Sequence, residues 1–235
     1  FKISDRPKKI KYKPSRQEVD IYDDYILENN NNFIVINKPR GIAVQAGTKS
    51  FRNIIDVLKD SKYFENTKPF IVHRLDKETS GVLIVAKNRE YAQLFTSLFR
   101  IRKIHKTYIA LTHGKISKNL KTLNDDLITF DNGKKYIQKA ISHLKILKVS
   151  SDFTYVELNP ITGRKHQLRK QLYNIGNPIV GDDKYFINRR ADKIKIRNNN
   201  LLLHAYKIKF MINDTQYTFK AKYDIEIENF LKKNF

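Results

Sequence analysis

The chain contains no cysteine, and this absence removes several kinds of chemistry at once. Disulfide bonds, thiolate nucleophiles and cysteine-based zinc sites all need that sulfur atom. Long apolar runs are missing as well, since none approaches the roughly 20 residues that a membrane-spanning helix needs. The chain begins at Phe1, and no signal-peptide pattern follows. We therefore expect a piece of a longer protein from the cytoplasm, a reducing compartment.

Glycine-rich phosphate loops are absent too. Neither Gly-x-x-x-x-Gly-Lys-Ser/Thr nor Gly-x-Gly-x-x-Gly occurs, which argues against an enzyme that uses a basic surface to bind a small nucleotide. A membrane-surface protein would need an amphipathic helix with a wide apolar face, and we find none in the sequence.

Positive charge, in contrast, is abundant. Lysine and arginine total 46 against 24 acidic residues, which gives a formal net charge of +22. Such a surplus raises the association rate with polyanions, of which nucleic-acid backbones are the commonest. A merely solvated surface is the alternative explanation. The 235 residues are 40% hydrophobic, enough for a core within one domain.

The chain divides into a basic arm, residues 1–20, and a folded domain, residues 21–235. Basic residues of the arm are Lys2, Arg6, Lys8, Lys9, Lys11, Lys13 and Arg16. In the domain, apolar patterns predict strands at residues 33–37, 82–86, 107–111, 140–147, 153–158, 201–210 and 217–221. Helices are predicted at residues 53–60, 90 to about 104, and 225–235, and Asp-Asn-Gly at 131–133 predicts a tight turn. We expect an α+β fold: a mixed, largely antiparallel central sheet with flanking helices.

The most informative segment is residues 73–81, His-Arg-Leu-Asp-Lys-Glu-Thr-Ser-Gly, which lead into the buried strand expected at 82–86. Loops held by a rigid sheet are where reactive groups usually lie. A carboxylate beside a guanidinium, such as Asp76 near Arg74, is kept ionised and therefore nucleophilic. A purely structural explanation also exists, in which the aspartate binds backbone amides and the histidine fills an edge of the core.

Two further kinds of site fit this segment less well. A hydrolase triad of Ser80, His73 and Asp76 lacks the Gly-x-Ser-x-Gly turn that exposes a serine nucleophile. A metal site would need His73 and Asp76 to converge with a distant His105 or His113, and no spacing in the sequence requires this.

The motifs His-Arg-Leu-Asp, Thr-Ser-Gly and Ala-Lys within residues 73–87 resemble the signature of the RluA family of RNA pseudouridine synthases. Other matches follow in family order: Asn-Lys-Pro-Arg-Gly at 37–41, Lys-Thr-Tyr at 106–108, Thr-Gly-Arg-Lys-His-Gln-Leu-Arg at 162–169, Asn-Pro-Ile-Val-Gly-Asp at 177–182 and Leu-Leu-His-Ala at 202–205. A non-catalytic RNA-binding protein with the same fold is the alternative. Such a protein should have lost Asp76 or Arg169, and this chain keeps both.

The resemblance implies a reaction and three catalytic residues. Asp76 matches the nucleophile of an enzyme that detaches uracil from its ribose, rotates the base and rejoins it through carbon. Whether the carboxylate adds to the sugar or the base, or triggers a glycal route, stays open. Tyr108 matches the tyrosine that stacks on the target base, and Arg169 matches the arginine that pairs with the aspartate. Because no group comes from outside, neither a metal nor a cofactor is expected.

The resemblance also implies RNA contacts. Arg74 matches a residue associated with displacing the target base. Arg164 and His166 are expected to contact RNA or to build the pocket wall, and Lys38 is a candidate phosphate contact.

The substrate and the partners follow from one branch of the family. The loop Gly-Ile-Ala-Val-Gln-Ala-Gly at 41–47 favours the RluC-like branch, which modifies 23S RNA of the large ribosomal subunit. We expect a monomer that binds ribosomal RNA or a precursor particle and no membrane, with an S4-type RNA-binding domain ahead of the arm. Lys170-Gln171 departs from the Val-His that often continues the arginine motif, which would alter one wall of the pocket.

Overall fold

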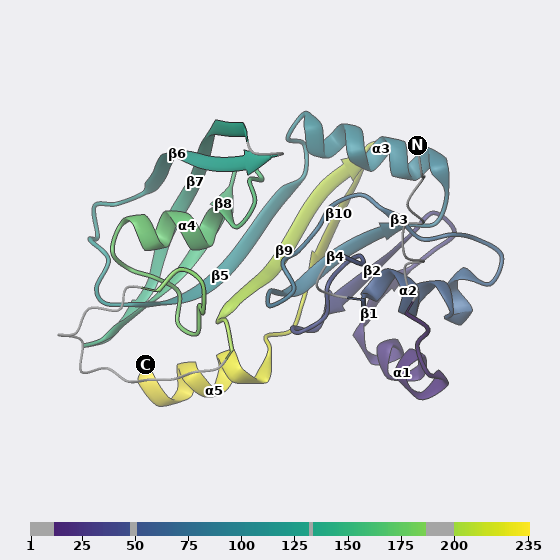
Figure 1. Ribbon diagram of the computed structural model, residues 1–235, viewed down its shortest axis with the longest axis horizontal. Coiled ribbons are helices and arrows are strands. Elements are labelled where there is room, and N and C mark those ends of the chain that lie inside the picture. The colour runs from purple at the N-terminus through teal and green to yellow at the C-terminus, as the bar shows by residue number, and fades with distance from the viewer. Residues whose placement is uncertain (1–11, 48–50, 132–133, 187–199) are drawn as a thin grey trace, which may run out of the picture.

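The computed structural model describes residues 12–47, 51–131, 134–186 and 200–235. Within these ranges, ten strands form one sheet, and helices pack against both of its faces (Figure 1). The strands are β1 (Ile26–Asn29), β2 (Phe33–Lys38), β3 (Phe70–Ile71), β4 (Ser80–Ala86), β5 (His105–His113), β6 (Thr122–Asp131), β7 (Lys134–Val149), β8 (Phe153–Pro160), β9 (Leu203–Ile212) and β10 (Thr215–Lys220). The α-helices are α1 (Arg16–Ile21), α2 (Ile54–Lys59), α3 (Arg89–Arg100), α4 (Gln167–Asn174) and α5 (Ile225–Asn234), and two short 3-10 helices are η1 (Tyr22–Tyr25) and η2 (Lys62–Phe64).

The order of the strands makes the sheet mixed but largely antiparallel. It runs β1-β2-β4-β9-β5-β8-β7-β6, with β10 paired to β9 and β3 to β4. Only β4 and β9 are parallel among the described pairs, which confirms the predicted fold class. This junction joins the two halves of the sheet that Figure 1 shows at right and at left.

The parallel junction depends on a glycine. Gly81 has a φ of +113°, and a Cβ atom there would lie 2.3 Å from the carbonyl oxygen of Ala205. Because no side chain fits at that distance, only glycine allows β9 to approach β4 so closely. The pairing joins the first residues of β4 to the first residues of β9, and the loop that contains Asp76 leads into this junction.

Both faces of each half are buried. In β2, Phe33 and Val35 face the cluster that contains Phe95 of α3, whereas Ile34 and Ile36 face α2 and η1. The other half has two further clusters, one against α4 and one against α5. A strand covered on both faces is apolar at successive positions, which explains the uninterrupted runs in β2 and β4.

The strands predicted from apolar patterns are confirmed, and so are the three helices. Most ends shift by a few residues, but β7 begins at Lys134 and not at residue 140. The predicted helix from residue 90 to about 104 ends at Arg100, because Arg102 adopts a left-handed conformation at φ 60°. The elements that were not predicted are α1, η1, β1, η2, β3, β6 and α4.

The end of the predicted basic arm is helical. Helix α1 begins at Arg16 with Ser15 as its N-cap, and Val19 packs on the core. Residues 1–11 of the arm lie outside the described residues. Residues 132 and 133 of the predicted tight turn lie outside them too, and β6 and β7 pair up to Asp131 and Lys134 on either side.

Candidate active site

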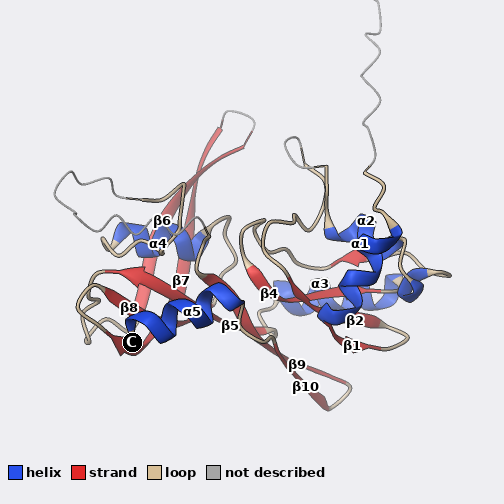
Figure 2. Cartoon of the chain, turned by 90° about the horizontal axis from the view of Figure 1, so that it is seen from below, coloured by secondary structure: helices blue, strands red, loops and turns tan. Residues whose placement is uncertain are grey.

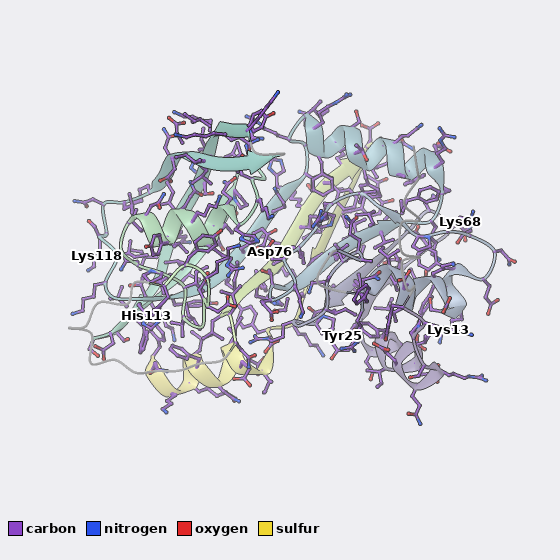
Figure 3. All side chains as sticks on the ribbon, in the orientation of Figure 1. Lys13, Tyr25, Lys68, Asp76, His113 and Lys118 are labelled. Atoms are coloured by element: carbon purple, nitrogen blue, oxygen red, sulfur yellow. The ribbon has the colours of Figure 1, made fainter. Side chains whose placement is uncertain are left out.

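Asp76 lies in the loop that leads into β4, near the middle of the molecule and between the two halves of the sheet (Figure 3). Leu75 is buried in the core beside it, and the backbone N–H of Thr79 donates to the Asp76 carbonyl at 3.1 Å. The carbonyl of Lys77 accepts from Gly41 N at 2.9 Å. The loop backbone is thus fixed on both sides of Asp76, while the Asp76 side chain stays 31% exposed.

The histidine at the start of this loop is structural. His73 Nε2 accepts a hydrogen bond from the backbone N–H of Ile84 at 2.9 Å, and its ring packs against Phe99. Burial, together with the charge of Lys106, lowers the pKa of His73 to about 3. The ring is therefore neutral and packs at the edge of the core.

The residues of the hydrolase triad do not assemble. Ser80 is buried, and its Oγ lies 2.9 Å from Nδ1 of His204, not from His73. Burial lowers the pKa of His204 to about 4. A buried serine bonded to a buried histidine supports the β4–β9 junction and cannot reach a substrate.

Arg169, on α4, forms its closest ion pair with Asp182. Its Nε donates to Oδ2 at 2.7 Å and its Nη2 to Oδ1 at 2.6 Å, and the Asp182 side chain is fully buried. Burial opposes the charge on Arg169, but the carboxylates of Asp182 and Asp76 raise its pKa above the ordinary value. The predicted pairing with Asp76 is thus an interaction at longer range, since the planar fork of Arg169 is occupied by Asp182.

His166 lies close to Asp76: its Nε2 is 3.7 Å from Asp76 Oδ1. His166 sits just before α4 in a left-handed conformation, φ 53°. Its Nδ1 lies 3.0 Å from the hydroxyl of Tyr185. Burial lowers the pKa of His166, against the opposing effect of Asp76.

Tyr108 reaches the same region from β5. Its ring packs against two core clusters, one in each half of the molecule. Burial, and then the charge of Asp76, raise the pKa of its phenol. Tyr108 therefore keeps its proton at neutral pH and presents a neutral aromatic ring near Asp76.

The candidate RNA contacts are placed differently from one another. Arg74 is exposed beside Asp76, and Arg164 is half-buried, with its Nε donating to the carbonyl of Lys139. Lys38 does not fit a phosphate contact, because its side chain is buried and its Nζ donates to three backbone carbonyls. The prediction for Lys38 is wrong for that reason.

Two site residues were missed by the sequence interpretation, Asp182 and Tyr185. Asp182 was within the family match at 177–182, but nothing in its spacing showed that it would bind Arg169. Among the described residues, no group of histidine, aspartate or glutamate is arranged to hold a metal ion, and no helix is long and apolar enough to cross a membrane.

Comparisons with known proteins agree on one family. Residues 32–174 match the family described as RNA pseudouridylate synthase, a span that includes Asp76, Tyr108 and Arg169. "Ribosomal large subunit pseudouridine synthase C" of Buchnera aphidicola subsp. Baizongia pistaciae is 38% identical over 88% of this chain and 68% of its own length. The protein of the same name from Rickettsia conorii is 38% identical over 70% of this chain, and the match spans only 57% of that relative.

A solved structure shows the same fold. "Human RNA Pseudouridylate Synthase Domain Containing 4" superposes with a TM-score of 0.78 at 27% identity, over 92% of this chain and 94% of that one. The family match covers more than half of the chain, and the Buchnera relative is similar along most of it. This chain therefore belongs to the RNA pseudouridylate synthase family.

Proposed function

We propose that this protein converts uridine to pseudouridine in RNA and that Asp76 is its nucleophile. The observation that carries the proposal is a partly exposed carboxylate on a fixed loop, with His166, Arg169 and Tyr108 around it. In this reaction the bond between N1 of uracil and C1′ of ribose breaks, and a bond between C5 and C1′ forms. C5 loses a proton and N1 gains one, so the atoms balance without a cofactor.

Each neighbour of Asp76 has a role that follows from its geometry. Arg169, held rigidly by Asp182, supplies a permanent positive charge that favours the carboxylate form of Asp76. Tyr108 offers a neutral ring on which a uracil can stack. Because its hydroxyl keeps its proton, Tyr108 can donate a hydrogen bond but does not act as a general base. Arg74, two residues before Asp76, is exposed, and in this proposal its side chain occupies the stack that the target base leaves.

We propose 23S ribosomal RNA of the large subunit as the substrate. The names of the Buchnera and Rickettsia relatives refer to the ribosomal large subunit, and the surplus of 22 positive charges favours a long polyanion. We further propose that the protein works as a monomer in the cytoplasm.

The substrate is tested by mapping pseudouridine in unmodified RNA. Transcripts of 23S and 16S ribosomal RNA would be incubated with the protein, treated with a carbodiimide that marks pseudouridine, and read by reverse transcription. We expect new stops at a few discrete uridines of the 23S transcript and none in the 16S transcript. Stops in both transcripts at similar density would contradict the proposed target.

A further inference from the structure

Tyr185 forms the outer end of a short series of contacts that leads to Asp76. Its hydroxyl lies 3.0 Å from Nδ1 of His166, and Nε2 of the same ring lies 3.7 Å from Asp76 Oδ1. The two nitrogens of His166 therefore face two different partners. What His166 presents to Asp76 depends on which nitrogen carries the proton.

The surroundings favour one tautomer of His166. Burial lowers the pKa of the ring, so it is neutral near pH 7 and carries one N–H. With that hydrogen on Nε2, the ring attracts the Asp76 carboxylate; with it on Nδ1, a lone pair of Nε2 would face the carboxylate. Burial also raises the pKa of Tyr185, so its hydroxyl keeps a proton that it can donate to Nδ1.

Tyr185 is itself held in place by Asp182. The Asp182 Oδ1 accepts hydrogen bonds from the backbone N–H groups of Lys184 and Tyr185, both at 2.9 Å. The same carboxylate binds Arg169, whose guanidinium carbon lies 5.3 Å from the centre of the Tyr185 ring. One buried carboxylate thus fixes both the arginine and the tyrosine.

We propose that Tyr185 is a positioning residue: its hydroxyl donates to Nδ1 of His166 and fixes the tautomer whose Nε2–H points at Asp76. The proposal rests on the proposed function, in which Asp76 is the nucleophile. The distance from Nε2 to Oδ1 is about 0.8 Å longer than an ordinary N–H···O hydrogen bond, a common feature of catalytic contacts without substrate. When the contact closes, the Nε2–H orients Oδ1 and leaves Oδ2 to face the uridine.

The tautomer can be observed directly. In protein labelled with ¹⁵N at its histidines, long-range ¹H–¹⁵N spectra distinguish a protonated ring nitrogen from an unprotonated one, and His166→Gln identifies the His166 signals. We expect a protonated Nε2 and an unprotonated Nδ1 in the wild type, and averaged signals in Tyr185→Phe. A protonated Nδ1 in the wild type, or unchanged His166 signals in Tyr185→Phe, would overturn the proposal.

The matched control is Tyr173→Phe. The centre of the Tyr173 ring lies 6.3 Å from that of Tyr185, and Tyr173 is exposed. The control variant therefore removes a tyrosine hydroxyl from the same region of the protein. Tyr185→Phe should lower kcat for uridine isomerisation about tenfold, the worth of one hydrogen bond, and change KM by less than about twofold. Tyr173→Phe should leave both constants as in the wild type. Equal kcat in the two variants would overturn the proposal.

Asp76→Asn, measured in parallel, keeps the two claims separate. If that variant isomerises uridine at the wild-type rate, the nucleophile is wrong, and the histidine spectra still decide the role of Tyr185. If Asp76→Asn is inactive while Tyr185→Phe behaves like Tyr173→Phe, the proposed function stands and the positioning role is overturned.

Discussion

Lys38 is a buried lysine whose ammonium group supports the catalytic loop. Its Nζ lies 2.7, 3.0 and 3.3 Å from the carbonyl oxygens of Pro39, Ile42 and Lys77. Burial lowers the pKa of Lys38 to about 7, against the opposing charges of Glu78 and Asp76. Three carbonyl acceptors match the three N–H donors of an ammonium, so the geometry favours the charged form. Because Lys77 follows Asp76, Lys38 helps to fix the position of the proposed nucleophile.

Lys38→Met should therefore destabilise the protein. The variant leaves three carbonyl oxygens without their donor, and we expect the free energy of unfolding to fall by about 3 kcal/mol. Urea unfolding measures the difference. Lys59→Met, which changes an exposed lysine at the end of α2, should differ from the wild type by less than about 0.5 kcal/mol. If the Lys38→Met variant is as stable as the wild type but binds RNA weakly, the result would support a phosphate contact by Lys38 and contradict the structural role.

At the scale of elements, the hairpin of β6 and β7 projects from the body of the sheet (Figure 2). Strand β8 pairs with β7 only between Ser142 and Val149, so the earlier part of β7 pairs with β6 alone. That part carries exposed lysines and two exposed apolar residues, Tyr136 at 45% and Ile137 at 66%. Arg164 and Lys170 from the α4 region donate to the carbonyls of Lys139 and Ile128 in the hairpin. We expect the hairpin to contact RNA beside the active site.

Charge reversal on the hairpin tests this expectation. Lys135 and Lys139 are exposed and point to the same side of β7, because they are four residues apart in one strand. Lys135→Glu with Lys139→Glu should weaken RNA binding and reduce the slope of log affinity against log salt by about 1 for each lost phosphate contact. Fluorescence anisotropy over a salt series measures both effects.

The control reverses the same number of charges elsewhere. Lys232→Glu with Lys233→Glu changes two exposed lysines on α5, which lies across the molecule from the hairpin in Figure 1. This variant should lose less affinity than the hairpin variant. If the two double variants weaken binding equally, RNA binding responds to net charge and not to the hairpin.

Sequence patterns predicted the elements with strong apolar periodicity and missed those without it. Strands β2 and β4 are uninterrupted apolar runs and were predicted almost to the residue. Helix α4 was missed because it buries polar side chains, Gln167, Arg169 and Gln171, and because its N-cap position is a left-handed histidine. Strand β6 was missed because it is rich in aspartate and pairs in a hairpin that is largely exposed.

The site shows a similar division. The motifs predicted a site around Asp76, and the structure brings Tyr108 and Arg169 into the region of that residue. Their catalytic roles stay predictions. The partner of Arg169 could not be predicted, because Asp182 is one of several carboxylates and its burial depends on the tertiary fold. Lys38 was predicted to contact phosphate at the surface because lysines are seldom fully buried, but its side chain is buried.

At the scale of the whole molecule, two neutral histidines that hydrogen-bond to residues of β4 couple folding to pH. The folded-state pKa is about 3 for His73 and about 4 for His204, below the ordinary value of about 6.5. Between pH 6.5 and 4 the unfolded chain therefore binds more protons than the folded protein. Stability consequently rises with pH through this window, and it is lost as the pH falls.

We expect the free energy of unfolding to decrease between pH 7 and pH 5, by up to about 1.4 kcal/mol per pH unit for each histidine. Urea unfolding at several pH values measures the slope. His204→Gln should reduce it, whereas His105→Gln, a change at an exposed residue of β5, should leave it as in the wild type. A slope that is the same in all three proteins would contradict a contribution from His204.

The central claim is that Asp76 carries out the isomerisation of uridine, and tritium release tests it most directly. Large-subunit ribosomal RNA labelled with tritium at C5 of uridine would be incubated with the wild type and with Asp76→Asn, and the tritium that passes to water would be counted. We predict release by the wild type and none above background with Asp76→Asn, although both proteins bind the RNA with similar affinity. Release by Asp76→Asn at a rate near that of the wild type would contradict the account.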